Sequence, residues 1–349
     1  MRSTYLEDDV EILLKDITGM VEPQSTEERE KLIQKGKHYC EMLPIEYVPT
    51  EKYMSVYKDA LSIFAKPTAI AIGKMADKII EKKGKDVVLV SLARAGIPIG
   101  VLAKRFIKKK YQYNVPHYAI SIIRGKGIDD NAMQFLLNRY EPEQIMFVDG
   151  WIGKGAILNE LKKDLRAYEG VTDEIAVVAD PANVTDLCGT HNDILIPSSC
   201  LNCTVSGLIS RTFLRDDIIG KKDFHGAVFY ENLISSDLSY EFIDCIEKEF
   251  EYDYKIEKEL VAHFGMDEIN NIVETFGIDD INFVKPGIGE TTRVLLRRVP
   301  WKVLINPKDK NDRALKHIIR LAEEKGVLIE EYALVNYKCC GIIKKIADV

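Results

Sequence analysis

Short, continuously apolar runs separated by helical segments are the feature of this 349-residue chain that most restricts its fold. Runs that stay apolar at every position, instead of alternating with polar residues, are typical of strands buried on both faces. Strands that alternate with helices favour a parallel sheet covered by helices on both sides, so we expect an α/β fold. The expected strands are residues 86–92, 117–123, 144–148 and 174–179, and the expected helices are residues 57–83, with a break at Pro67, 98–108 and 155–168.

The segments on either side of this pattern are predicted to be an N-terminal arm and a small C-terminal domain. Residues 1–55 are polar and interrupted by prolines, so we expect an extension that wraps onto the core, with a short amphipathic helix between Leu6 and Leu14. The central domain is expected to span residues 56–250 and the last domain residues 251–349. In the last domain, helices are expected at 256–276, 291–297 and 313–325, and strands at 281–284, 301–305 and 327–334.

Composition and charge exclude several classes of protein. No run of 18 uncharged apolar residues is present, so we expect no membrane-spanning helix, and the acidic start of the chain does not resemble a secretory signal. Seven scattered cysteines favour a reducing cytoplasm over a disulfide framework. The net charge of −7 is unevenly distributed, because residues 285–349 carry 14 basic and eight acidic side chains, or +6, which leaves −13 for the remainder. Any nucleic acid is therefore expected to bind the C-terminal domain.

Three loops that contain glycine follow expected strands, and ligands of open parallel sheets bind beyond the carboxyl ends of the strands. The first combines an arginine with a small residue and a glycine, which suits a diphosphate. The second is basic and suited to closing over a charged substrate. The third places an acid before a glycine-rich turn and a helix, which suits an anion beside ribose hydroxyls or a metal. In chain order the loops are Arg94, Ala95 and Gly96; Arg124 and Lys126; and Asp149 and Gly150 with Gly153, Lys154, Gly155 and Ala156.

The order and content of these loops resemble the type I phosphoribosyltransferase fold. The resemblance implies that the Arg94 loop holds diphosphate, that Arg124 and Lys126 lie on the flexible loop, and that the Asp149 loop binds phosphoribosyl diphosphate. It also implies group transfer at the ribose C1 atom, with Mg²⁺ carried by the diphosphate near Asp149. Gly150 stands where the family usually has a second acid.

A loop rich in serine and cysteine follows an apolar run at residues 193–196, which resembles a further strand. Its polar side chains are expected to cover the base or a phosphate, and they are Ser198, Ser199, Asn202, Ser206 and Arg211. Cys200 is an alternative nucleophile, which would need His191 or His225 within reach. The alternative to both roles is a set of small residues that shape a pocket.

A glycine loop in the C-terminal domain precedes a helix, and its pattern resembles the RNA-binding motif of the Pelota and kink-turn-binding ribosomal protein family. Backbone N–H groups at such a helix start, together with neighbouring cations, suit an RNA backbone or base edge. The expected RNA-binding residues are Lys285, Gly287, Gly289, Glu290, Thr291, Thr292 and Arg293.

Over residues 30–349 the chain resembles the StiP family, whose members join a phosphoribosyltransferase-like domain to a Pelota-like domain, are associated with tellurium-resistance gene clusters and stress response, and bear the name cysteine protease. We expect a phosphoribosyltransferase that acts on phosphoribosyl diphosphate or a ribonucleotide and binds RNA through its C-terminal domain. Two alternatives stay open: a cysteine protease that uses Cys200, and a non-enzymatic nucleotide or RNA sensor. A homodimer is also left open, and no membrane partner is expected.

Overall fold

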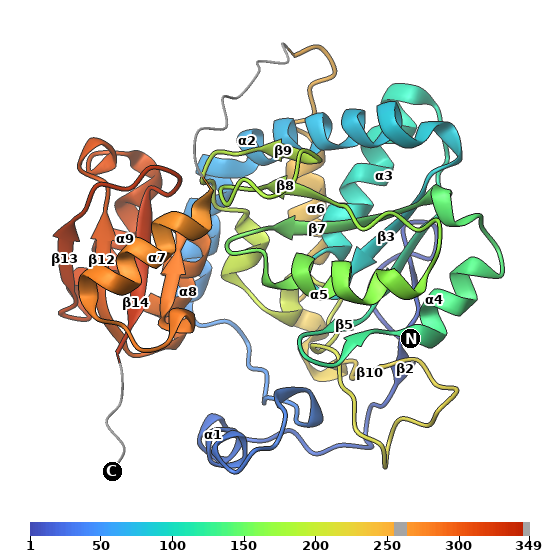
Figure 1. Cartoon of the computed structure of the whole chain (residues 1–349), viewed down its shortest axis with the longest axis horizontal. Coiled ribbons are helices and arrows are strands. Elements are labelled where there is room, and N and C mark those ends of the chain that lie inside the picture. Colours follow the sequence, from blue (N-terminus) through green and yellow to red (C-terminus); the bar gives the residue numbers. More distant parts are fainter. Residues whose placement is uncertain (255–263, 345–349) are drawn as a thin grey trace.

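A six-stranded parallel sheet forms the centre of the molecule, and a separate four-stranded sheet forms its C-terminal domain (Figure 1). The structure is a computed structural model and describes residues 1–254 and 264–344. The order of the central sheet is β1-β4-β3-β7-β8-β9, and all its neighbouring strands run parallel. An α/β fold with a parallel sheet, as the apolar runs predict, is therefore confirmed.

The elements of the first 254 residues surround the central sheet. The helices are α1 (Thr26–Gln34), α2 (Glu51–Lys83), α3 (Ile97–Tyr111), α4 (Asp130–Leu137), α5 (Ala156–Asp164) and α6 (Ser239–Glu247). The sheet strands are β1 (Glu11–Ile12), β3 (Val88–Leu92), β4 (His117–Ile120), β7 (Ile145–Trp151), β8 (Ile175–Ala179) and β9 (Cys188–Thr190). Two small pairs complete the set: β2 (Lys15–Asp16) with β10 (Gly226–Ala227), and β5 (Ile122–Ile123) with β6 (Gly127–Ile128).

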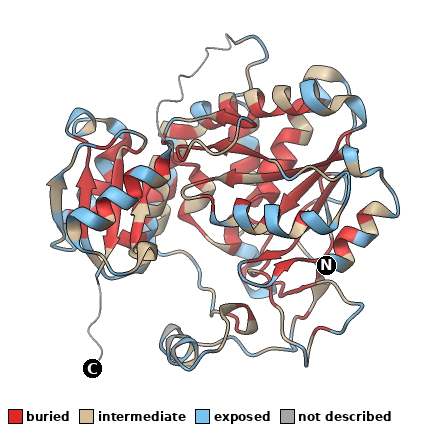
Figure 2. Ribbon diagram, viewed as in Figure 1, coloured by how far each residue is buried: buried red, intermediate tan, exposed pale blue. Residues whose placement is uncertain are grey.

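Successive residues of the central strands enter two different hydrophobic cores. Leu89 packs in the core formed with α2, α3 and α6, whereas Val88 and Val90 pack in the core formed with α4 and α5. Because side chains of a strand alternate between its faces, both faces of the sheet are covered by helices. Figure 2 shows the result as an almost continuously buried sheet between helices with exposed outer faces.

Several expected elements differ in the structure. The strand expected at residues 281–284 is mostly a 3₁₀ helix, Ile281–Phe283. Helix α2 is continuous through the exposed Pro67, because its first part packs against the C-terminal domain and its second part against the sheet. The expected helix from Leu6 to Leu14 is absent, since β1 pairs with β4 at this place. The run at residues 193–196 forms no strand, and β7 extends beyond residue 148 to Trp151.

The C-terminal domain packs its helices on both sides of a small mixed sheet, β11-β14-β12-β13. Its strands are β11 (Val284–Pro286), β12 (Pro300–Ile305), β13 (Leu328–Glu331) and β14 (Cys339–Ile343), and its helices are α7 (Gly265–Phe276), α8 (Gly287–Arg297) and α9 (Lys316–Glu324). Part of the helix expected at 256–276 lies outside the described residues. Within residues 1–254 and 264–344, no helix has both the length and the apolar character needed to cross a membrane.

A shared core joins the two domains. Val56, Tyr57 and Phe64 of α2 pack in one cluster with Ile288 and Leu295 of α8. Buried Asp193 adds polar contacts, because its carboxylate accepts the backbone N–H groups of Ile288 (3.0 Å) and Lys338 (3.0 Å). The start of α8 is thereby held against the central domain.

Candidate functional site

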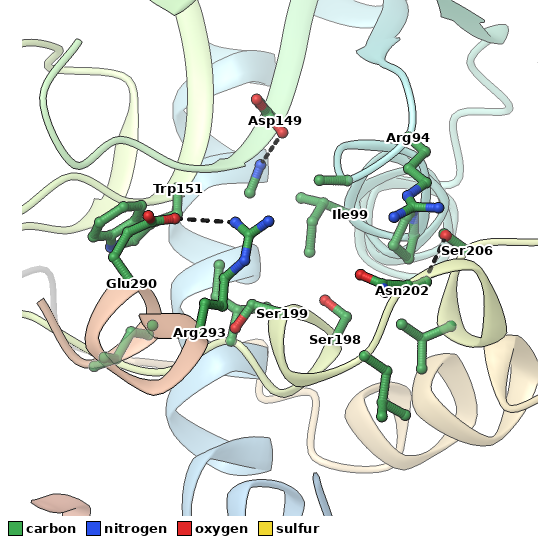
Figure 3. A pocket seen from close by; sticks show the side chains of 18 residues that line it. Arg94, Ile99, Asp149, Trp151, Ser198, Ser199, Asn202, Ser206, Glu290 and Arg293 are labelled. Carbon is green, nitrogen blue, oxygen red and sulfur yellow. Dashed lines mark hydrogen bonds and ion pairs between the residues drawn. The ribbon is translucent and has the colours of Figure 1, made fainter. Parts of the chain in front are cut away.

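Two adjoining hollows lie where the carboxyl ends of β3 and β7 meet the start of α8. The inner cavity has a volume of about 270 Å³ and the outer cleft a volume of about 940 Å³. Figure 3 shows the inner cavity, with side chains from the central sheet, the Ser-Cys loop and α8 pointing into it. Residues expected from the sequence that line one or both hollows are Arg94, Ala95, Asp149, Gly150, Ser198, Ser199, Asn202, Ser206, Arg211, Lys285, Gly289, Glu290 and Arg293.

Arg94 follows β3 and is held at the wall of both hollows. Its Nη1 atom donates to Glu46 Oε1 (3.2 Å) and to the carbonyl oxygen of Ile209 (3.2 Å). Gly96 does not line either hollow, and a Cβ atom at this position would lie 2.6 Å from the carbonyl oxygen of Val148. The glycine therefore permits close packing of the loop on the sheet, and Arg94 is already paired with a carboxylate.

Asp149 lies within β7 and faces the cavity as a half-buried carboxyl group. Burial raises its pKa to about 6, and the hydrogen bond from the N–H of Gly150 (2.7 Å) only partly offsets this effect. Among the described residues no group of three His, Cys, Asp or Glu side chains is arranged to hold a metal ion. A cation at Asp149 would therefore need oxygen ligands from a bound phosphate.

The glycine-rich turn after β7 faces the C-terminal domain instead of the cavity. Lys154 Nζ donates to the carbonyl oxygens of Ile281 (3.0 Å) and Val284 (3.1 Å), and Tyr337 Oη donates to the carbonyl oxygen of Gly153 (2.7 Å). Burial, followed by the charge of Lys285, lowers the pKa of Lys154 to about 8. Gly155, with a φ of 80°, caps α5 and Ala156 begins it, and no residue of this turn lines either hollow.

The expected flexible loop lies on the turn between β5 and β6. The backbone N–H of Arg124 donates to Tyr39 Oη (3.0 Å), and its Nη1 donates to Asn282 Oδ1 (3.4 Å) of the C-terminal domain. Neither Arg124 nor the exposed Lys126 lines the hollows. The structure thus does not bring this loop into the cleft.

Cys200 lies in the Ser-Cys loop, but its thiol is enclosed. The residue has no exposed surface, and burial raises its thiol pKa to about 12. The histidines considered as its base lie elsewhere: His191 contacts Cys188, and His225 Nδ1 is 2.8 Å from Ser121 Oγ. In the described part of the chain, Cys200 has no histidine partner that could activate it.

The glycine loop of the C-terminal domain is used mainly for docking. Gly287 has a φ of 82°, and the N–H of the next residue, Ile288, is accepted by Asp193. Thr291 and Thr292 are buried, and their hydroxyl groups donate to backbone carbonyls of the same motif. Lys285, Gly289, Glu290 and Arg293 remain on the side that faces the hollows.

A buried cysteine, Cys188 at the start of β9, contacts His191, which follows β9 and lies near Asp180 after β8; none of the three lines either hollow. His191 Nε2 is 3.3 Å from Cys188 Sγ, and its Nδ1 is 2.9 Å from the carbonyl oxygen and 3.8 Å from the carboxylate of Asp180. The sequence analysis missed this group. The Cys-x-x-His spacing is the signal that could have found it.

A second cysteine, Cys40, also contacts a histidine. Its Sγ atom is 2.9 Å from His38 Nδ1, but the same nitrogen accepts the N–H of Cys40 (3.3 Å). His38 therefore acts here as the N-cap of a short 3₁₀ helix, and its ring stacks near Tyr39.

Comparison with known proteins adds three findings. Residues 3–247 match the family described as tellurite-like stress resistance cysteine protease StiP, and residues 263–345 match the Pelota RNA-binding domain. The chain is 33% identical to "Cysteine protease StiP" of Acinetobacter baylyi (strain ATCC 33305 / BD413 / ADP1), over 98% of this chain and 94% of the relative. No solved structure matches the chain.

These names correct the main functional prediction. The loops at Arg94, Arg124 and Asp149 predicted a phosphoribosyltransferase, but the family and the relative are named as cysteine proteases, so the transferase prediction is wrong. The positions of the loops are mixed, because Arg94 and Asp149 line the hollows, whereas Arg124, Lys126 and the glycine-rich turn at residues 153–156 do not. The predicted membership and the Pelota-like C-terminal domain are confirmed: the chain belongs to the StiP family of tellurite-like stress resistance cysteine proteases.

Proposed function

We propose that this chain is a cysteine peptidase in which Cys188 is the nucleophile and His191 the general base. The observation that carries the proposal is the position of the His191 ring between the Cys188 sulfur and Asp180. A thiol is activated when a base lies within reach and a third group orients that base. The family name supports the reaction class, and the contact supports the choice of residues.

The hydrogen bond at Nδ1 supports His191 as the base. A carbonyl oxygen accepts but cannot donate, so the contact with the Asp180 carbonyl oxygen (2.9 Å) places the proton of a neutral His191 on Nδ1. Nε2 then carries the lone pair and is the nitrogen nearer to Cys188 Sγ (3.3 Å). The Asp180 carboxylate is itself fixed by the N–H groups of Val184 and Thr185.

The Cys188 sulfur contacts the His191 ring but is not aligned with one of its nitrogens. Cys188 Sγ is also 3.7 Å from Nδ1, so the sulfur lies beside the ring and not in line with one nitrogen. Catalytic hydrogen bonds are often loose without substrate and tighten when it binds.

The proposal is tested by peptide hydrolysis, measured with casein and with a fluorogenic peptide mixture. Cys188→Ala is expected to lower kcat/KM at least about 100-fold, because no thiol remains to attack the carbonyl. Cys200→Ala and Cys245→Ala are expected to retain activity within about twofold, since neither thiol contacts a histidine among the described residues.

Mass spectrometry of the chain treated with a peptide-directed electrophile supplies the second measurement. Cys188 is as buried as Cys200, but the label is expected on Cys188 because its thiol contacts the His191 ring. Loss of activity in Cys200→Ala with an active Cys188→Ala would overturn the assignment in favour of the Ser-Cys loop.

We propose, as a second function, that the C-terminal domain binds RNA. The match of residues 263–345 to the Pelota RNA-binding domain supports it, together with Lys285 and Arg293, which lie beside one another on the side of the motif that faces the outer cleft. Because Asp193 already accepts the Ile288 N–H, side-chain cations and not that N–H group would contact phosphates. Gel-shift titration of Lys285→Glu with Arg293→Glu is the test, and unchanged binding would contradict it.

Three finer expectations stay proposals. The parallel order β4-β3-β7-β8 supports a type I phosphoribosyltransferase-like sheet as a fold alone. Seven free cysteines support a cytoplasmic location. Mg²⁺ is proposed only as a companion of a phosphorylated ligand at Asp149, where titration calorimetry with and without such a ligand would detect it.

A further inference from the structure

The outer cleft contains more positive than negative charge, and both domains contribute to it. Seven Arg or Lys side chains line it against three Asp or Glu side chains. Two of the acids are paired with arginines, Glu46 with Arg94 (3.2 Å) and Glu290 with Arg293 (3.0 Å). The cleft therefore has a net positive charge. The cations outside these two pairs are Arg29, Arg211, Lys285, Arg297 and Arg298.

Two of these cations are partly buried without a carboxylate partner among the described residues. Arg211 Nη2 donates to the carbonyl oxygens of Tyr39 (2.9 Å) and Met42 (3.2 Å). Arg297 donates to Asn202 Oδ1 (2.7 Å) and to the Cys200 carbonyl oxygen (3.1 Å). The Nε atoms of both arginines are buried and have no hydrogen-bond acceptor.

Burial and neighbouring positive charges both lower the pKa of the Arg211 and Arg297 guanidinium groups. Burial first, and then Arg29 and Arg94, lower the pKa of Arg211 to about 10. Burial first, and then Arg293, lower the pKa of Arg297. Holding partly buried cations together is costly unless an anion neutralises them, so the cluster is suited to a ligand with several negative charges.

An exposed aromatic side chain in the same cleft indicates which class of anionic ligand would bind there. Tyr47, which lines the same cleft, is 70% exposed. Proteins that bind single-stranded nucleic acid combine a basic groove with aromatic rings on which unpaired bases stack. The adjoining inner cavity is lined by apolar side chains together with charged groups such as Arg94 and Asp149. The Ser199 hydroxyl there is buried without a hydrogen-bond partner among the described residues, which suits the edge of one base.

We propose that single-stranded RNA binds in the outer cleft across both domains, with its phosphates at Arg211, Arg297 and Arg298 and an unpaired base on Tyr47. The proposal rests on the RNA-binding function proposed above and extends it, because half of the site then belongs to the central domain. The expected partner is a strand without a complement, since the bases of a duplex are not free to stack on Tyr47.

Fluorescence anisotropy of the full chain with a labelled 12-nucleotide RNA tests the proposal, over a series of salt concentrations. Tyr47→Ala is expected to weaken binding about tenfold through the lost stacking. Arg298→Gln, at an exposed position, is expected to weaken binding several-fold and to reduce the salt slope by about 0.7, the value for one phosphate contact on a single strand. Arg313→Gln is the matched control, since Arg313 lies in the same domain, is exposed and lines neither hollow.

The outcomes separate this inference from the function on which it rests. If the wild-type chain binds no RNA, both are overturned. If it binds and only Lys285 and Arg293 variants weaken it, RNA binding stands but the extension to the central domain is wrong. Duplex RNA that binds as tightly as the single strand would also overturn the extension.

Photo-crosslinking of RNA that contains 4-thiouridine provides a measurement without any substitution. Crosslinks are expected in peptides that include Tyr47 or the Ser-Cys loop, as well as in peptides of α8. Crosslinks confined to residues 264–344 would contradict a site shared by both domains.

Discussion

The outer cleft differs from the β8–β9 edge, the group formed by Asp180, Cys188 and His191. The cleft offers a binding surface, whereas the edge offers a thiol beside an imidazole. The cleft has space and charge, but Cys200 beside it is enclosed and has no histidine partner in the described residues. The edge has a thiol, an imidazole and a carboxylate close together, but Cys188 is as buried as Cys200, and neither Cys188 nor His191 lines a hollow. Binding surface and reactive groups are thus separate in this chain.

The largest expected effect tests the chemistry of the edge. His191→Ala removes the base next to Cys188, so kcat/KM for peptide hydrolysis should fall about 10²–10⁴-fold, the usual range for a general base. The pH profile of the variant should lose the limb that reports the base. Circular dichroism verifies the fold, and His225→Ala, which removes a histidine bonded to Ser121 and not to a thiol, is the comparison variant. Equal losses in both variants would show that the edge has no special role.

The second effect concerns Asp193, whose carboxylate holds the start of α8 against the central domain. Burial raises the pKa of Asp193 to about 7, against the opposing hydrogen bonds from Ile288 and Lys338, whereas an unfolded Asp titrates near about 3.9. The folded state therefore binds more protons between about pH 4 and pH 7, and stability falls as pH rises through that window and levels off above it.

The variant Asp193→Asn cannot titrate and should remove this part of the pH dependence. The difference in unfolding free energy between pH 5 and pH 8 is expected to shrink by about 2–4 kcal/mol relative to wild type. Urea titrations at the two pH values measure it, with Asp173→Asn on the exposed surface as the control. The same pH dependence in both proteins would contradict a raised pKa at Asp193.

The third effect compares two glycines of one motif. Gly287 has a φ of 82°, and a Cβ atom there would lie 2.9 Å from Asp193 Oδ1, so Gly287→Ala should lower the unfolding free energy by about 2 kcal/mol. Gly289 lies within helix α8, and the nearest atom to an added Cβ there is Ser199 Oγ at 3.7 Å. Gly289→Ala should be neutral or stabilise the chain by up to about 1 kcal/mol. Thermal melts of both variants decide, and equal effects would mean that the φ of Gly287 is unimportant.

The sequence predicted the strands whose own residues form a continuous apolar run. The apolar runs at β3, β4, β7 and β8 are visible because these strands are buried on both faces. Strand β9 was missed, since it has three residues, one of them a glycine packed against the backbone of Ala71. The break at Pro67 was wrong because packing on both domains keeps α2 continuous.

The site was less predictable because it depends on contacts between distant residues. The sequence identified Arg94 and Asp149, which do line the hollows, from their place after strands. It could not show that Lys154 binds carbonyl groups of the C-terminal domain, or that Asp193 accepts N–H groups 95 and 145 residues away. The glycine-rich turn therefore lies against the C-terminal domain, a position that the sequence pattern alone could not indicate.

The smallest expected effect returns to the cleft and to its balance of charge. Glu290 forms an ion pair with Arg293 (3.0 Å) and is one of three acids in a cleft proposed for RNA. Glu290→Gln removes a negative charge near the phosphates and releases Arg293, so RNA affinity should rise about two- to threefold. The gain should vanish at high salt, because partly exposed charges are screened there. Anisotropy titrations at two salt concentrations measure it, and Glu323→Gln on α9, outside both hollows, is the matched control. A loss of affinity would instead indicate that Glu290 contacts the RNA itself. The cleft would then bind RNA through a specific polar contact as well as through its positive charge.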